Sequence, residues 1–434
     1  MLKRQLGLWQ AVMLGLGIMI GAGIYVLVGV AGVEAGDALW LSFAIGAIIS
    51  IFTALTYAEL SSMYPFDGSS YLYSKRAIGS RTLSFLLGWF MVVAYTSGAA
   101  TVSMGFGQYL QNLLPIPVTL GATVLLLFLG MLNYKGMKYV TFFSAFGTLV
   151  SVVALLSIIG LFLNISGLSG LEFSFTSPKG MGGILSGALL AVFAFFGFEV
   201  LANAAEEVKD PRRNVPRAII ISLLIVSVIY MLIALAFTAA LPYEKIVETV
   251  NNGKGSLAVA AEAFGGPVFH LIVVLGGLLS TSSTVVVVLM GISRLIYGMA
   301  EDKALPHRLL STNKSGVPGL AVLIATIFSI CLVFYGDLGL VARLAVSAMF
   351  ILFIFDNLSL IRLRLTSPKL ARPFRIPLSI ANVPITAVLA ILSMGYLLAY
   401  EFLNFPGLLA GLVVLTIVGL LLNKAEYWLA AAER

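Results

Sequence analysis

The sequence predicts an all-α membrane protein with twelve transmembrane helices, and three observations lead to this fold class. The 434-residue chain is 60% hydrophobic and 10% charged, whereas a soluble domain carries about 25% charged residues. Its mean hydropathy is +1.05, and apolar runs long enough to cross a bilayer recur along its whole length. Two of these runs are interrupted by glycine. We therefore expect a polytopic helix bundle in which two helices are discontinuous.

The individual spans follow from apolar runs separated by polar residues. They cover residues 8–32, 38–63, 82–110, 118–133, 139–164, 181–203, 216–241, 267–298, 318–335, 340–361, 383–402 and 406–423. The first run is too long for the apolar core of a signal peptide, so we expect it to be retained. Two longer loops interrupt the series, at 165–180 and 242–267. The second either forms short surface helices or is a simple connector.

The charge distribution predicts the topology. With the N-terminus inside, only Lys179, Lys245 and Lys254 among the cations fall in outside loops, and Arg343 lies near the outer end of span ten. This positive-inside bias predicts an integral protein of the plasma membrane with both termini in the cytoplasm. The net charge of +7 is accordingly a topology signal, and no nucleic acid partner is expected. A single cysteine, Cys331, and two histidines argue against a disulfide framework, a metal site or a cofactor.

The first interruption is the stretch Met19–Tyr25, which contains Gly21 and Gly23 within an apolar run. An unsatisfied backbone group costs several kcal/mol in hydrocarbon. An unwound turn is therefore tolerated at this depth only where it lines a cavity. The alternative is a continuous helix whose small residues let a neighbouring helix pack closely.

The second interruption, Phe193–Glu199, again places a glycine, Gly197, in an apolar segment and follows it with an acid. Interrupted segments at corresponding positions of two halves indicate the substrate site of a secondary transporter. The two breaks open spans one and six, so each begins a five-helix repeat, and an odd number inverts the second repeat. We expect repeats at 1–164 and 181–365, followed by two appended spans at 383–424.

Three strings on the predicted cytoplasmic side extend the pattern. They are Tyr64–Tyr73 after span two, Glu206–Ala218 after span six and Ser293–Asp302 after span eight. Together with the first break, they resemble the amino acid, polyamine and organocation (APC) superfamily, closest to its prokaryotic amino acid permeases. The likeness covers nearly the whole chain in order. It implies the LeuT-type fold, a five-plus-five inverted repeat with discontinuous helices one and six.

The resemblance also implies a substrate site at the two breaks. The matching residues are Met19, Gly21, Ala22, Gly23, Ile24, Phe193, Phe196 and Gly197. In the family, backbone N–H groups of the first break hold the substrate carboxylate, and carbonyls matching Met19, Phe193 and Phe196 hold its ammonium. Electrostatics agrees, because a half-helix N-terminus is partly positive and a C-terminus offers carbonyls. Phe193 matches an aromatic gate over the substrate, although aromatic packing is the alternative.

Two acids in predicted spans receive different interpretations. Glu199 lies beside the second break, where an ionisable group is costly and indicates function. We expect it to act in gating or proton carriage, and a structural hydrogen bond is the alternative. Asp356, with Asn357, is one to two turns from Arg362, so we interpret this pair as interfacial.

The coupling ion is left open among three possibilities. Several relatives carry a lysine in span five, and the matching position here is Ser151, so this fixed positive charge is missing. Span eight brings a run of hydroxyls in which Ser283 and Thr284 are candidate sodium ligands. Such hydroxyls also commonly bond back to a carbonyl four residues earlier. Sodium coupling, uncoupled exchange and proton coupling through Glu199 are all retained.

The expected function is secondary active transport or exchange of neutral, apolar L-amino acids by alternating access, with no enzymatic chemistry. The chain has no phosphate-binding loop of the G-x-x-x-x-G-K-[ST] type. A polyamine or organic-cation transporter is the alternative within transport, although such a cargo favours more acidic partners than Glu199. An amino acid sensor that binds without translocating is the alternative of another class. The oligomeric state is left open.

Overall fold

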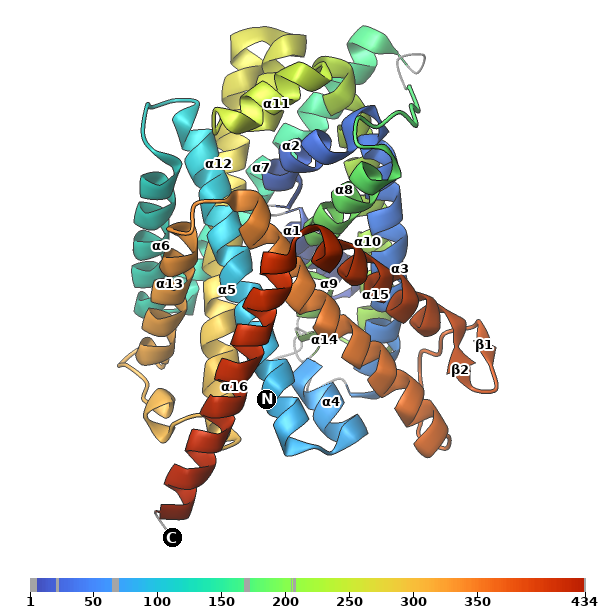
Figure 1. Ribbon diagram of the computed structural model, residues 1–434, viewed down its shortest axis with the longest axis vertical. Helices are drawn as coiled ribbons and strands as arrows, with labels where there is room; N and C mark the ends of the chain where they lie inside the picture. The colour runs from blue at the N-terminus through green and yellow to red at the C-terminus, as the bar shows by residue number, and fades with distance from the viewer. Residues whose placement is uncertain are drawn as a thin grey trace.

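The computed structural model describes residues 6–20, 23–64, 70–167, 172–203, 205 and 208–432, which form a helical bundle (Figure 1). The first half contains α1 (Leu8–Met19), α2 (Gly23–Ala35), the short 3₁₀ helix η1 (Gly36–Ala38), α3 (Leu39–Met63), α4 (Ser70–Ile78), α5 (Arg81–Gln111), α6 (Val118–Lys135) and α7 (Met137–Ser166).

The second half contains α8 (Gly180–Ala194), α9 (Phe198–Asn203), α10 (Pro211–Ala240), α11 (Tyr243–Asn251), α12 (Ser256–Glu301), η4 (His307–Leu310), α13 (Gly319–Val333), α14 (Leu338–Thr366), α15 (Ile385–Asn404) and α16 (Pro406–Ala432). Two short antiparallel strands, β1 (Ser379–Ile380) and β2 (Val383–Pro384), join α14 to α15.

The helices have the length and composition of membrane spans. Within the described residues, ten helical stretches are long and apolar enough to cross a bilayer, and α1 and α13 are shorter apolar helices. Every range expected to span from the sequence coincides with a helix, with α1 and α2 together covering the first and α8 and α9 the sixth. The chain is therefore an integral membrane protein, and the number of crossings stays a prediction.

Both predicted interruptions are helix breaks. α1 ends at Met19 and α2 begins at Gly23, while Gly21 and Ala22 lie outside the described residues. α8 ends at Ala194, and a turn leads to Phe198 at the start of α9. In this turn Gly197 has φ +125°, a conformation that favours glycine.

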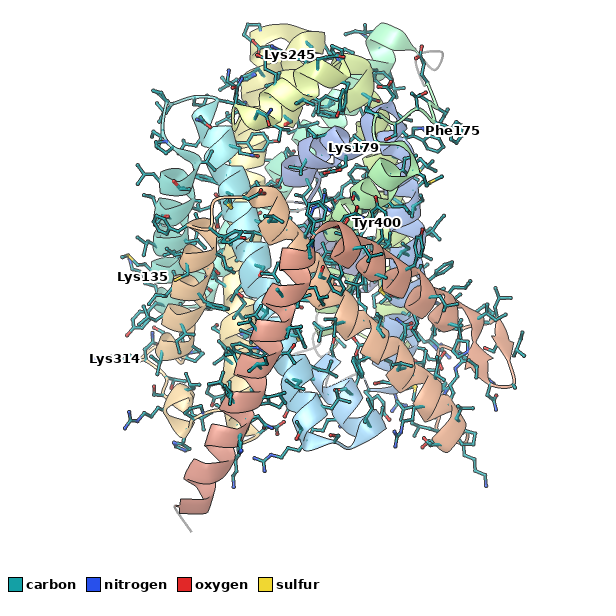
Figure 2. The ribbon with its side chains drawn as sticks, viewed as in Figure 1. Lys135, Phe175, Lys179, Lys245, Lys314 and Tyr400 are labelled. Atoms are coloured by element: carbon teal, nitrogen blue, oxygen red, sulfur yellow. The ribbon has the colours of Figure 1, made fainter. Side chains whose placement is uncertain are left out.

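The second long loop forms the surface helices suggested by its sequence. α11 and the first part of α12 lie at the end of the molecule opposite α4 (Figure 1). α12 then kinks at Gly266, which has φ +70°, and continues from Pro267 as a long helix. Figure 2 places Lys179 and Lys245 toward the α11 end, with Lys135 and Lys314 farther from it. Which end of the molecule faces the cytoplasm stays a prediction.

The interior of the bundle is built by helices distant in sequence. α12 packs along both α5 and α7, α14 packs along α5, and α10 packs along α3. α2 and α8, which belong to the two interrupted helices, pack on each other. Helix α6 shows its apolar side chains Leu120, Val124 and Phe128 on the exterior, as expected for a surface that faces lipid.

Two clusters of buried charge tie the helix ends together. Arg343 at the start of α14 pairs with Glu401 of α15, and its Nη2 lies 3.0 Å from Glu34 Oε1 of α2. At the other end of α14, Arg364 Nε donates to Glu59 Oε1 of α3 at 2.8 Å. In these two clusters each carboxylate has an arginine partner, which offsets the cost of removing its charge from water.

Candidate functional site

A cavity of about 590 Å³ lies where the two breaks meet, within the range of about 300–1,000 Å³ typical of small-molecule sites. It is bordered by parts of α1, α2, α4, α5, α8, α9, α12 and α14. The predicted site residues on its wall are Met19, Gly23, Phe193, Phe196, Gly197, Glu199, Ser283 and Thr284.

Other predicted residues lie elsewhere. Ile24 and Ser151 are fully buried and neither borders the cavity. Gly21 and Ala22 are outside the described residues, as are the motif segments 65–69 and 206–207. Within the described residues, the cavity wall at the breaks is therefore formed by the end of α1, the start of α2 and residues of the second break.

The first break is held by side chains from other helices. The carbonyl of Met19, expected to face the substrate ammonium, accepts a hydrogen bond from Tyr230 Oη of α10 at 2.6 Å. The next carbonyl, that of Ile20, accepts from Ser280 Oγ of α12 at 3.4 Å. Each carbonyl oxygen has two lone pairs, so a second donor can still bind. The sequence does not pair Tyr230 with Met19, because the two lie 211 positions apart.

Gly23 brings the two breaks into direct contact. A Cβ at this position would lie 2.1 Å from Ala194 Cα and 2.7 Å from Ala194 Cβ, at the last residue of α8. Glycine is thus required for α2 and α8 to approach backbone to backbone. Close helix packing, the alternative interpretation of this glycine, is present in the structure, and Gly23 also borders the cavity.

The second break closes on itself. Phe195 N–H donates to the carbonyl of Val192 at 3.0 Å, and Phe196 N–H donates to that of Phe193 at 3.2 Å. Gly197 N–H donates to Glu199 Oε2 at 2.8 Å. The carboxylate of Glu199 therefore accepts a hydrogen bond from a backbone N–H group just before α9. The structural hydrogen bond considered for Glu199 exists, while its role in gating or proton carriage stays a prediction.

The cavity wall near the breaks is apolar and aromatic. The rings of Phe193 and Phe196 are 5.5 Å apart, and Phe196 meets Phe353 of α14 edge-on at 5.8 Å. Val287 and Val288 of α12 border the cavity. This part of the wall suits a hydrophobic group and provides little to pair with a charge.

The other end of the cavity is charged and reaches exposed residues. Arg294 and Glu301 of α12 border it together with Asp302, the residue after α12, and all three are exposed. Asp302 Oδ2 is 2.9 Å from Lys75 Nζ of α4. The breaks are therefore reached from the α4 end of the molecule.

Comparison with known proteins decides the family. A sequence profile described as amino acid permease matches residues 6–420. The chain belongs to the amino acid permease family. This permease is 29% identical to the branched-chain amino acid permease BcaP of Bacillus subtilis over 95% of this chain and 92% of that protein. Amino acid transport is therefore its general activity, and it is not an enzyme.

Two further relatives are also transporters. The permease is 29% identical to the methylthioribose transporter of Bacillus subtilis, over 94% of this chain and 89% of that protein. It is 31% identical to the inner membrane transport protein YbaT of Escherichia coli, over 72% of each chain. The likeness thus extends along most of the chain.

The predicted ion ligands all donate hydrogen bonds within their own helices. Ser151 Oγ donates to the carbonyl of Gly147 at 2.6 Å, and the Ser283 and Thr284 hydroxyls donate to that of Ser280 at 2.8 and 3.1 Å. A Cβ on Gly147 would lie 2.8 Å from Ser283 Cβ, so α7 and α12 are adjacent here. The back-bonding alternative is thus observed, and sodium binding stays a prediction.

Asp356 and Asn357 correct the sequence interpretation. Both are fully buried, whereas we expected an interfacial pair. Asp356 Oδ2 accepts from Tyr57 Oη, and Asn357 Oδ1 accepts from Thr56 Oγ1, both at 2.6 Å. The reason is that α14 turns this face toward α3. An ionisable residue inside an apolar run was the available signal, the same one that identified Glu199.

Proposed function

We propose that this permease is a secondary active transporter or exchanger that moves neutral, apolar L-amino acids by alternating access. The main supporting observation is the apolar wall at the meeting point of the two breaks, with Met19, Phe193, Phe196 and Val287 on it. A branched aliphatic side chain would gain about 25 cal/mol for each Å² of apolar surface it buries there. The branched-chain specificity in the name of the relative BcaP supports the same class.

We propose twelve spans with the LeuT-type inverted repeat, at 1–164 and 181–365, and two appended spans at 383–424. The helix contacts support this arrangement because they occur in swapped pairs. α5 packs on α14 as α12 packs on α7, and α3 packs on α8 as α10 packs on α1. When every helix is replaced by its counterpart in the other repeat, the contact of α5 with α14 becomes that of α12 with α7, and the contact of α3 with α8 becomes that of α10 with α1. A pseudo-two-fold relation between the repeats requires this correspondence.

The substrate pose follows from the difference between the two half-helix starts. The first turn of α2 contains no acid, whereas that of α9 contains Glu199. The partly positive N-terminus of α2 is the more favourable partner for the substrate carboxylate. Its ammonium then faces the carbonyls of Met19 and Phe196, and its side chain contacts the aromatic wall.

The conformation is inward-facing in this proposal. The cavity extends to exposed Asp302 near α4, the side that the positive charges assign to the cytoplasm. Closure at the α11 end is supported by the contacts of Arg343 with Glu34 and Glu401, which join α2, α14 and α15. Alternating access would separate these helices and close the α4 end.

Transport could be coupled in three ways, which predict different responses to ion gradients. Sodium coupling would use oxygen atoms of Ser283 and Thr284 beside the first break. Proton coupling would use Glu199. Uncoupled exchange would need neither ion. Substrate accumulation in proteoliposomes under an inward sodium gradient, an inward proton gradient or no gradient distinguishes the three.

The function is tested by counterflow of labelled leucine in proteoliposomes with competing solutes. We expect unlabelled isoleucine, valine or alanine to compete, and arginine, lysine and putrescine to have no effect. Competition by the cations alone would support the polyamine or organic-cation alternative. Ligand at 100 times its dissociation constant stabilises the fold by about 2.7 kcal/mol. Thermal stabilisation by leucine without counterflow would support the sensor alternative.

A further inference from the structure

Two buried carboxyl groups in the middle of the bundle differ from the others. Glu199 and Asp356 are 3% and 0% exposed. The ion pairs and hydrogen bonds within the described residues give neither of them a lysine, arginine or histidine partner. Glu59 and Glu401, which are equally buried, are both paired with arginine.

The arginines of α14 lie too far along the helix to compensate Asp356. At 1.5 Å per residue, Arg364 is about 12 Å and Arg343 about 20 Å away along the helix axis. Both are engaged with Glu59 and Glu401. Arg294 borders the same cavity as Glu199 but is exposed at its charged end.

The polar side chains around the pair are hydroxyl groups. The cations of α4 are exposed, with Lys75 paired with Asp302 and Arg76 lying over the Tyr64 ring. α3 contributes Tyr57, whose hydroxyl is 2.6 Å from both Asp356 Oδ2 and Ser70 Oγ of α4. α4 also contributes Tyr73, whose ring packs on Tyr57 at 6.0 Å. α5 contributes Tyr95, which borders the same cavity as Glu199. α8 carries no titratable side chain, and Lys424 of α16 is exposed.

The two carboxyls belong to adjoining segments of the bundle. The Tyr57 ring packs on Phe198, the residue before Glu199, at 5.6 Å, and the same tyrosine donates to Asp356 Oδ2. The rings of Phe198 and Phe353, the latter three residues before Asp356, are 5.4 Å apart. Asp356 Oδ1 accepts no hydrogen bond from the described residues. Two like charges buried together without a cation repel each other and lose hydration, so at least one carboxyl favours its neutral form.

We propose that Glu199 and Asp356 together hold one proton, and that this proton controls the second break. Glu199 borders the cavity and exchanges protons with water, whereas Asp356 is behind it. Loss of the proton leaves two carboxylates whose repulsion acts on α9 through the bond from Glu199 Oε2 to Gly197 N–H. Its consequence for transport rests on the proposed function, because the second break forms part of the substrate site.

The proton is detected directly by infrared spectroscopy of the purified, full-length protein without substrate. We expect a protonated carboxyl band at neutral pH that disappears in alkali. In Glu199→Gln and in Asp356→Asn the remaining carboxyl no longer has a charged neighbour. The pH at which this carboxyl releases its proton should be about one unit lower than in the wild type, which corresponds to a tenfold lower proton affinity. The double variant should lack the band, and Glu34→Gln, which alters an arginine-paired carboxyl, should keep the wild-type titration.

The infrared titration tests the shared proton, and the counterflow measurement tests transport. Absence of the band in the wild type, or the same titration in both single variants as in the wild type, would overturn the shared proton. Tyr57→Phe provides a test that keeps both carboxyls and the aromatic packing, and it should change the pH at which the band disappears. Leucine counterflow measured on the same preparations tests transport independently. A titrating band without counterflow would reject the transporter proposal and retain the proton site.

Discussion

The two helix breaks look alike in sequence but are stabilised in different ways. At the first break, the carbonyls of Met19 and Ile20 are held by Tyr230 and Ser280 from the second half of the chain. At the second, successive turns and the carboxylate of Glu199 satisfy the backbone locally. The geometry of the first break therefore depends on how the helices are arranged, whereas that of the second is set largely by its own residues. Rearrangement of the bundle should therefore alter the first break most.

The largest effect is expected from Gly23→Leu at the first break. Its Cβ would overlap Ala194 Cα at 2.1 Å, and relief requires movement of the backbone of α8. We expect leucine binding to be lost, with a stability cost of about 1–3 kcal/mol or more for overpacking. Gly160→Leu on α7 is the matched control, because a Cβ there would meet nothing within 4 Å and Gly160 does not border the cavity. Normal elution with wild-type leucine affinity for Gly23→Leu would show that the contact between the breaks is dispensable.

An intermediate effect is expected at the second break. Glu199→Gln keeps an oxygen that can accept from Gly197 N–H, whereas Glu199→Ala removes it and leaves a buried donor unsatisfied, at a cost of about 1–3 kcal/mol. Leucine binding should therefore weaken more in the alanine variant than in the glutamine variant, as measured by thermal stabilisation. Equal binding by the two variants would mean that the hydrogen bond of Glu199 does not maintain the second break.

The smallest effect is expected from Tyr230→Phe, which removes the hydroxyl that donates to Met19 and keeps the ring. The loss of one hydrogen bond of about 0.5–1.5 kcal/mol should weaken leucine binding by about two- to tenfold. Tyr396→Phe serves as control, since Tyr396 is 60% exposed on α15. A Tyr230→Phe variant indistinguishable from this control in a binding titration would contradict the external support of the first break.

Local features of the sequence are sufficient to predict the helices and the positions of both breaks. Apolar run length, proline and glycine act over a few residues, so the expected spans coincide with helices, and the interruptions at Met19–Tyr25 and Phe193–Glu199 appear as α1 to α2 and α8 to α9. The three motif strings and the first break likewise indicated the family that the sequence profile confirms.

The side chains that surround those breaks could not be predicted, because they come from helices distant in the sequence. Tyr230 reaches Met19 across 211 positions, and Tyr57 reaches Asp356 across 299. Contacts of this kind depend on how helices pack and rotate, which leaves no local pattern in the sequence. Packing of α14 buries Asp356, which was expected at the interface, and packing of α2 directs Ile24 away from the cavity wall. Side-chain direction on a buried helix is set by its neighbours, because an all-round apolar helix has no face of its own to specify it.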